Sequence, residues 1–352
     1  MNFGIEIPAM GASEIVRLAV LGEKVGFDTV WWTDHFSGGP PTEIMPELFT
    51  VMAIMGHETK RVKVGSAVTD VRRRHPATVA QTAATLDVMS DGRTILGLGA
   101  GEATNLAPMG ISAQNMHGRL EEGIKLIRML WAADHLHPAN FQGKFYALKN
   151  AFLQVKPSQK RGPPIYVAAY GPKMLELAGE LGDGWIPFAH TPETFQWGFD
   201  IVKKSLSEHG RSLDGFSVAY APNSTVSTDR EAARKVITPI AKTGVAIMPQ
   251  QYEQLMGKRH PGFEYSMAGS PDLKNITELK DTIPEDIALK TVIWGTPDDC
   301  IEQIESFAKV GCNHVIFAIR GKDLDQVITL FGSKVLPYFQ NDKKETKNNQ
   351  PK

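Results

Sequence analysis

A single carboxylate, Glu102, directly follows three alternating glycines in the segment Gly97-Leu-Gly-Ala-Gly-Glu102. The apolar residues Thr94–Leu98 lead into it and predict a short buried strand. Alternating glycines leave the backbone bare, so a flat or phosphorylated ligand can approach it closely. A carboxylate at the carboxyl end of a strand is a usual place for an acid or a base in α/β enzymes. An ordinary glycine-rich turn between a strand and a helix also fits this segment, because short glycine motifs recur by chance.

Other polar side chains follow apolar segments that have the character of strands. Glu6 lies near the end of the first such segment, and the pair Asp34-His35 follows the second. A histidine beside a carboxylate can act as a general acid or base, or it can donate a hydrogen bond to a bound ring. The alternative interpretation is an aspartate that caps a turn, with the histidine merely adjacent to it.

Two further segments could bind an anion. In Ala169-Tyr-Gly-Pro-Lys173, glycine and proline precede a predicted helix, whose free N–H groups and dipole favour negative charge. The basic run Arg72-Arg-Arg-His75 could bind an acidic cofactor tail or a substrate phosphate. The alternatives are an ordinary helix start and a solvated loop whose arginines pair with local carboxylates.

Motifs for several other chemistries are absent from the sequence. It contains no Gly-x-Ser-x-Gly elbow, no His-Glu-x-x-His and no Walker-type loop. The glycines at 97, 99 and 101 lack the spacing of a nicotinamide-binding Rossmann motif. The two cysteines, Cys300 and Cys312, stand at an interval that fits no zinc pattern, so the sequence indicates no metal site.

The candidate residues need a scaffold that brings several strand ends together. In the first half of the chain, short apolar segments alternate with amphipathic helical patterns, and the fourth such unit ends near Ala132. Apolar strands joined by helices imply a buried parallel sheet. A chain of this length that continues the pattern closes as an α/β fold of the (β/α)8 TIM-barrel type, with all carboxyl ends at one rim. The expected strands of this half are Asn2–Ile7, Thr29–Thr33, Val62–Val68 and Thr94–Leu98.

The second half keeps this rhythm with interruptions. We expect residues 133–163 to leave the barrel, with a hairpin turn at Phe141–Tyr146. Residues 240–285 have weak periodicity and are expected to form an insertion over the barrel mouth. We predict one domain over residues 1–340 and a polar, frayed tail over residues 341–352. The expected strands of this half are Pro164–Ala169, Gly184–Pro187, Phe216–Val226, Thr291–Trp294 and His314–Ala318.

The charge and the hydrophobicity of the chain limit the kinds of molecule that it can bind. A formal net charge of −1 gives no long-range attraction for nucleic acid or for an anionic membrane. No apolar run approaches the length of a membrane span, and the chain opens on strand-like residues and not on a signal peptide. We therefore expect a cytoplasmic protein that acts on a small molecule.

Taken together, the motifs resemble the bacterial-luciferase-like superfamily of flavin and deazaflavin barrels. Within it, the chain is most similar to the enzymes that use coenzyme F420: methylenetetrahydromethanopterin reductase, F420-dependent alcohol dehydrogenase and F420-dependent glucose-6-phosphate dehydrogenase. The resemblance spans nearly the whole chain. Its most specific segments are Gly22–Asp28, Thr33–His35, His75–Gln81, Gly99–Glu102 with Asn105, and Tyr170–Pro172.

The resemblance implies a role for each strand end. Asp34 and His35 match a pair that sits against the deazaflavin ring, and Ala67–Val68 matches a non-prolyl cis peptide that supports the ring from behind. Glu102, His35 and Glu6 are the implied catalytic residues, with Glu102 moving the proton that accompanies hydride transfer. The residues implied to bind the cofactor are Asp34, Ala67, Val68, Thr69, Gly101, Asn105, Ala169, Gly171, Pro172 and Lys173.

The resemblance leaves the substrate open among a methylenetetrahydromethanopterin-type compound, an alcohol and a sugar phosphate. The F420-dependent glucose-6-phosphate dehydrogenase has a lysine in the loop that corresponds to Phe188–Thr191 of this chain. This chain therefore matches only part of the pattern for a sugar-phosphate substrate. The candidate substrate contacts are Trp32, His190, Lys258, Arg259, His260 and Lys290. A homodimer is also implied, packed through the helices at Ala77–Met89 and near Phe49–Gly56.

Two other functions are compatible with these residues. An FMN-dependent monooxygenase can use the same barrel, and it differs at ring position 5, where nitrogen permits oxygen activation and carbon does not. Glu102 and Asn105 after the glycines favour the deazaflavin branch. A non-catalytic barrel that binds a flavin or another protein is the second alternative, and the presence of Asp34, His35 and Glu102 speaks against it.

Overall fold

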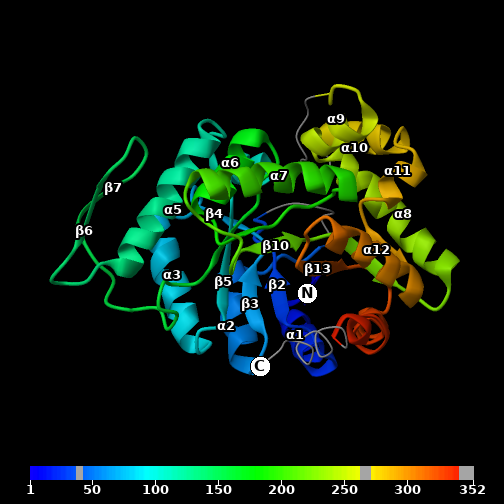
Figure 1. Ribbon diagram of the computed structural model, residues 1–352, viewed down its shortest axis with the longest axis horizontal. Coiled ribbons are helices and arrows are strands. Elements are labelled where there is room, and N and C mark those ends of the chain that lie inside the picture. Colours follow the sequence, from blue (N-terminus) through cyan, green and yellow to red (C-terminus); the bar gives the residue numbers. More distant parts are fainter. Residues whose placement is uncertain (37–42, 262–270, 341–352) are drawn as a thin grey trace.

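Parallel strands close into a ring in the computed structural model, which describes residues 1–36, 43–261 and 271–340 (Figure 1). Within these ranges, eight strands pair in turn around the ring, and the last pairs with the first. The predicted (β/α)8 barrel is therefore confirmed. The predicted tail, residues 341–352, lies outside the described residues. The ring strands are β1 (Asn2–Glu6), β2 (Thr29–Trp32), β3 (Lys63–Ser66), β5 (Thr94–Gly99), β8 (Ile165–Val167), β9 (Gly184–Trp185), β10 (Ser217–Tyr220) and β13 (His314–Ile319).

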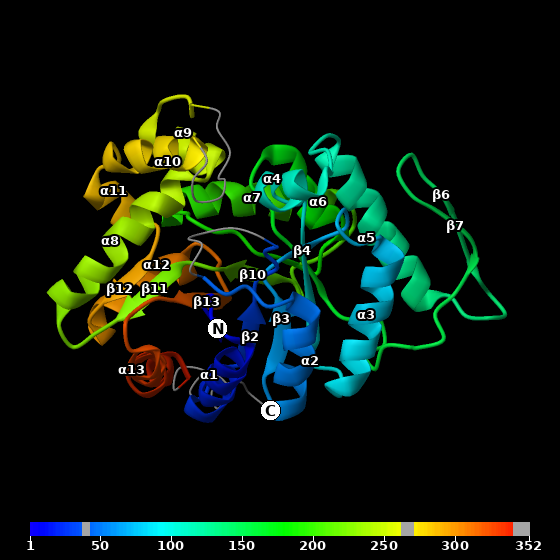
Figure 2. The same cartoon turned by 180° about the vertical axis from the view of Figure 1, so that it is seen from behind.

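Helices cover the outside of the ring, and their ends follow from local sequence (Figures 1 and 2). The α7 helix starts with a capping box in which Thr191 and Thr194 each accept the other's backbone N–H. The α1 helix stops at Gly26, whose φ of 108° is favoured by glycine. Their apolar faces pack onto the strands in one large hydrophobic cluster. These helices are α1 (Ala12–Val25), α2 (Leu48–Glu58), α3 (Pro76–Met89), α5 (Met116–Ala132), α6 (Pro172–Leu181), α7 (Pro192–Glu208), α12 (Pro297–Lys309) and α13 (Leu324–Leu330).

Side chains fill the interior of the barrel. Trp31, Ile95, Tyr166 and Ile316 belong to a second buried cluster, whose members alternate along the strands with those of the outer cluster. Gly65 makes room for the Trp31 indole, because a Cβ atom at Gly65 would lie 2.2 Å from a ring carbon of that side chain. A ligand therefore has to bind above this filled interior, at the rim of the barrel.

Two segments of the second half differ in how well the sequence predicted them. The expected hairpin is confirmed, because β6 (Ala139–Gln142) pairs antiparallel with β7 (Ala147–Ala151). The expected strand over residues 216–226 is divided into β10 and β11 (Asn223–Val226). Pro222 lies at the break because a proline has no N–H to donate to a neighbouring strand.

A group of helices with its own hydrophobic core lies to one side of the barrel (Figures 1 and 2). We call this group the cap; its buried cluster includes Ile237, Val245, Tyr252 and Trp294. The expected start of this insertion, residue 240, lies inside α8. No helix in the described ranges is both long enough and apolar enough to cross a bilayer. The cap comprises α8 (Arg230–Ala246), α9 (Pro249–Met256), α10 (Pro271–Asp281), α11 (Glu285–Leu289) and β12 (Ile293–Gly295).

Candidate active site

The carboxyl ends of the ring strands carry the polar residues that the sequence singled out. Glu6 ends β1, Asp34 and His35 follow β2, and Glu102 follows β5. Neighbouring ring strands run parallel, so these ends share one rim. His35 lies at the centre of the group, because Nδ1 of its ring is 3.7 Å from Oε2 of Glu102 and its charge influences Glu6.

Asn105 sets the hydrogen-bonding state of the His35 ring. Oδ1 of Asn105 accepts the backbone N–H of Phe36 at 2.8 Å, which orients Nδ2 toward His35 Nδ1 at 3.1 Å. An amide nitrogen donates, so Nδ1 of a neutral His35 accepts and the ring proton resides on Nε2. The Nε2–H group is then the donor that His35 can offer to a ligand, and 30% of this side chain is exposed.

Glu102 is accessible to a ligand at the same rim. Its side chain is 62% exposed, and the hydroxyl of Thr104 donates to Oε2 at 3.4 Å. The exposed carboxylate can exchange a proton with solvent and with a molecule bound at the rim.

The Asp34 carboxylate is buried and fully engaged by its neighbours. It accepts hydrogen bonds from the Thr69 hydroxyl at 2.6 Å and from Arg73 and Arg74 at 2.7 Å each. Arg73 also binds Asp70 at 2.6 Å. The structure therefore makes Asp34 and Thr69 parts of a charged network that fixes the loop beneath His35. Cofactor contact by either side chain stays a prediction.

An apolar floor lies beside this network. The peptide between Ala67 and Val68 is cis, as the resemblance implied. Ala67, Val68 and Ala168 are partly buried and pack onto the filled interior of the barrel. Gly97 and Gly99 face them without side chains: a Cβ atom at either glycine would lie within 3.0 Å of Val68, at 2.8 and 2.9 Å. The two glycines therefore make room for Val68, and the backbone that the sequence suggested would be bare to a ligand is covered there by this side chain. The small apolar side chains of Ala67, Val68 and Ala168 suit contact with a flat ring.

Glu6 is an unusual acid at this rim. Burial raises the pKa of the Glu6 carboxyl above its ordinary value, while the charges of Arg320 and His35 oppose the rise. Burial likewise raises the pKa of Glu43, with Arg320 again opposing it. Arg320 follows β13 and lies among these carboxyls, so it supplies positive charge from the last ring strand. A glutamate that keeps its proton to a higher pH is suited to act as a general acid.

The start of α6 offers a place for an anion. Gly171 is the N-cap residue, Pro172 is the first helical residue, and no side chain caps this end. A Cβ atom at Gly171 would meet nothing within 4 Å, so the space before the helix is open. The N-terminal N–H groups and the helix dipole favour negative charge there, and the exposed Lys173 adds to it.

His190 joins the barrel rim to the cap. Its ring is 1% exposed and stacks on Tyr170 with ring centroids 6.2 Å apart. Nδ1 bonds the Thr194 hydroxyl and Nε2 bonds the Gln251 amide, both at 3.1 Å. Burial lowers the pKa of His190 to about 3, so the ring is neutral. His190 therefore anchors α9 to the barrel, and substrate contact stays a prediction for it.

The other candidate substrate contacts occupy varied positions. Trp32 is fully buried and donates from Nε1 to the carbonyl of Pro46 at 3.1 Å. His260 is also buried, with Nε2 2.9 Å from the carbonyl oxygen of Ala246 in the cap. Lys258, Arg259 and Lys290 are exposed. The structure thus spreads this group over the cap and the barrel, and their contact with a substrate stays a prediction.

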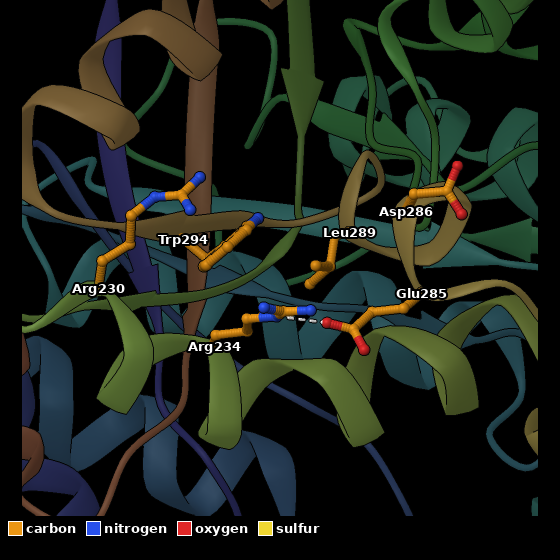
Figure 3. A pocket seen from close by; sticks show the side chains of 6 residues that line it. All are labelled: Arg230, Arg234, Glu285, Asp286, Leu289 and Trp294. Atoms are coloured by element: carbon orange, nitrogen blue, oxygen red, sulfur yellow. Dashed lines mark hydrogen bonds and ion pairs between the residues drawn. The ribbon is translucent and has the colours of Figure 1, made fainter.

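A separate cavity of about 380 Å³ lies between α8, α11 and β12 (Figure 3). Three of its charged side chains, those of Arg230, Arg234 and Glu285, have partners. Arg234 binds Glu285 at 2.5 Å, and the Arg230 guanidinium lies 4.7 Å from the centre of the Trp294 ring. This cavity holds none of the residues that the sequence or the rim geometry indicates.

Comparisons with known proteins identify relatives of the chain. A sequence profile described as luciferase-like monooxygenase matches residues 2–314. The chain is 31% identical to 5,10-methylenetetrahydromethanopterin reductase of Archaeoglobus fulgidus, across 96% of this chain and 99% of that protein. It is 31% identical to F420-dependent glucose-6-phosphate dehydrogenase of Amycolatopsis mediterranei, across 93% and 94%. A solved F420-dependent secondary alcohol dehydrogenase, in complex with an F420–acetone adduct, matches at a TM-score of 0.78 and 27% identity, covering 96% of this chain and 98% of that one.

Fold, rim and relatives define the class: barrel oxidoreductases that depend on a flavin or a deazaflavin. The chain belongs to the luciferase-like monooxygenase family, which confirms the resemblance inferred from its motifs. Sequence reasoning missed Arg320 and Gln251. Arg320 follows an apolar strand directly, a signal that could have identified it, whereas nothing local marks Gln251 as a partner of His190.

Proposed function

We propose that this protein is an F420-dependent oxidoreductase that passes a hydride between the deazaflavin and an organic substrate. The observation that carries the proposal is the His35 ring, because Asn105 engages Nδ1 and leaves the Nε2–H group to a ligand at the rim. The F420-dependent relatives support the choice of deazaflavin, since two of them cover nearly the whole chain.

Each rim residue has its own role in the proposed reaction. A bound deazaflavin supplies two-electron hydride chemistry at a ring carbon. His35 donates a hydrogen bond or a proton from Nε2, and the exposed Glu102 carboxylate takes up or returns a proton at the same rim. Glu6 is a second acid, because its raised pKa keeps it protonated to a higher pH. Gly171 and Lys173 at the α6 start hold the cofactor phosphate.

Anaerobic titration of the purified protein with F420 and with FMN tests this proposal. We expect F420 fluorescence to respond saturably, and FMN to compete weakly at equal concentration. The F420-loaded protein is then mixed with secondary alcohols, glucose 6-phosphate and methylenetetrahydromethanopterin. One of these substrate classes should bleach the deazaflavin absorbance in the absence of oxygen.

Two results would contradict the proposal. Tight binding of FMN without a response to F420, followed by substrate-dependent oxygen consumption, would assign the protein to the monooxygenases on the same barrel. Binding of a flavin or deazaflavin with no turnover of any substrate would indicate a non-catalytic binding barrel.

A homodimer packed through α2 and α3 is part of the proposal. These two helices pack against each other, and each carries an apolar side chain that a partner could cover, Ile54 at 44% and Met89 at 53% exposure. Analytical ultracentrifugation should give twice the mass of the chain. A double variant, Ile54→Asp with Met89→Asp, should sediment as a monomer, whereas Leu136→Asp, at an exposed site outside these helices, should remain a dimer. A wild-type monomer would contradict this part.

A further inference from the structure

Arg320 has guanidinium donors that no acceptor in the described residues uses. Nη1 of this side chain donates to the carbonyl oxygen of Ile319 at 2.9 Å. Nε and Nη2 have no acceptor in the described ranges, and neither belongs to the buried unpaired atoms there. The residue is partly exposed, so both donors are open to a ligand. Nε and Nη2 form one edge of the guanidinium, and such an edge binds the two oxygens of a carboxylate.

The backbone directs the Arg320 side chain into the barrel mouth. Ile316 belongs to the cluster inside the barrel and Phe317 to the outer one, so alternate residues of β13 face inward. The N–H of Arg320 donates to the carbonyl oxygen of Ser224 at 2.8 Å, which extends the pairing of β13 with β11. Arg320 therefore continues the inward series of Ile316 and Ala318, about 7 Å nearer the mouth than Ala318.

Glu6 lies beside Arg320 on the same side of the sheet. It pairs with Ala318 in the register of β1 and β13, and paired residues of parallel strands point to the same face. The charges of Arg320 and His35 both act on Glu6, and they both act on Glu43, so these side chains gather at one place in the mouth. Arg320 forms no ion pair with a carboxylate of the described residues. Burial raises the pKa of both carboxyls, so they neutralise the guanidinium only in part.

Arg320 faces the wall of the barrel on which a flat ring can lie. In the ring order, β1, β2 and β3 separate β13 from β5 on one side, and β10, β9 and β8 separate them on the other. The two strands are therefore opposite each other. Val68 and Ala168 of the apolar floor lie next to Gly99, the last residue of β5. A ring on that floor leaves its other face toward β13, and a substrate between the two can place an acidic group on Arg320.

We propose that Arg320 selects a carboxylic acid as the substrate and holds its carboxylate opposite the bound ring. This inference rests on the proposed function and narrows its substrate to hydroxy acids and their oxo counterparts. A carboxylate carries one charge and presents two oxygens in a plane, so the free Nε–Nη2 edge can bind it with two hydrogen bonds. A phosphate ester carries up to two charges, and the nearby carboxyls of Glu6 and Glu43 disfavour a dianion beside a single guanidinium.

The test compares each acid with its own methyl ester, which removes the negative charge and keeps the carbon skeleton. Without oxygen, the protein loaded with oxidised F420 is mixed with linear hydroxy acids of increasing length, and the protein loaded with reduced F420 with their oxo counterparts. Fluorescence of the loaded cofactor reports binding, and its absorbance reports turnover. For at least one acid, KM should be lower than for its ester by at least roughly tenfold, because a hydrogen bond to a charged group is lost in the ester.

Arg320→Gln should remove this preference. The KM of the acid should rise by roughly tenfold or more, and the KM of the ester should stay within a factor of about two. Arg320→Lys keeps the charge but lacks the two-donor edge, so it should recover part of the preference. Arg230→Gln removes a guanidinium at the separate cavity of the cap and should keep the wild-type values for both ligands. Titration with F420 shows whether each variant is folded and binds the cofactor.

An effect of Arg320 on the charge of Glu6 alone would give a different result. It would alter the pH profiles of acid and ester alike, and equal losses for the two in Arg320→Gln would overturn the carboxylate assignment. A panel in which no acid binds or reacts would overturn it too, as would turnover of glucose 6-phosphate that depends on Arg320. The proposed function stands in these cases if any substrate bleaches the deazaflavin. Failure of the wild-type protein to bind F420 would overturn both.

Discussion

Replacing Asp34 with asparagine is expected to lower the free energy of unfolding by about 3 kcal/mol. The carboxylate is 4% exposed and neutralises two guanidinium groups, of which that of Arg73 is 6% exposed. An amide of the same shape cannot balance this buried charge. The loss lies at the low end of the range for buried pairs because Arg73 keeps its bond to Asp70. Equilibrium unfolding in urea, followed by circular dichroism, measures the change.

Asp325→Asn is the matched control for this experiment. Asp325 binds Arg17 at 2.6 Å, as short as the Asp34 contacts, but the two side chains are about half exposed, at 51% and 47%. Solvent screens such a pair, so we expect a loss of about 1 kcal/mol or less. Equal losses in the two variants would contradict the claim that burial makes the Asp34 network important to stability.

Replacing His35 with glutamine is expected to lower kcat by about 10²- to 10⁴-fold, the usual contribution of a general acid or base. Glutamine can still accept the hydrogen bond from Asn105 and donate one of its own, but it cannot transfer a proton. The affinity for F420 should therefore change by less than roughly tenfold. Stopped-flow measurement of deazaflavin bleaching gives the rate, and fluorescence titration gives the affinity.

His137→Gln serves as the control for this loss. His137 also lies beside a carboxylate, 3.3 Å from Asp134, but it is 83% exposed and lies in the segment between α5 and β6. Its replacement should leave kcat unchanged. An active His35→Gln variant with wild-type kcat would remove His35 from the chemistry, and Glu102 or Glu6 would then have to supply the proton.

Much of the fold could be predicted from the sequence because its signals are local. The α1 and α6 helices have clear local boundary signals, since Gly26 terminates one and Pro172 starts the other. The cap was harder to predict. The α8 helix contains Pro239, and the buried face of this helix has a core only after α10 and α11 pack against it. The apolar face of α8 is present in the sequence, but the sequence does not show which elements cover it.

The site was predictable to the extent that barrel topology alone determines it. Parallel strands bring Glu6, His35 and Glu102 to one rim, whatever side chains surround them. The pairing of charges was not predictable in this way. Arg72, Arg73 and Arg74 are identical in type and adjacent in sequence, and only the positions of Asp34, Asp70 and Glu47 distinguish them. Such pairings depend on side chains from distant elements, which sequence patterns do not encode.

The separate core of the cap has a consequence for how this protein can diverge. The cap residues around Ile237 and Tyr252 pack among themselves, apart from the large cluster that holds the strands. Mutations in α9, α10 and α11 can accumulate there without displacing His35 or Glu102. We expect chimeras that exchange the cap between relatives to fold, and to inherit substrate preference from one parent and redox chemistry from the other. The cap can thus change in sequence while the rim residues keep their positions.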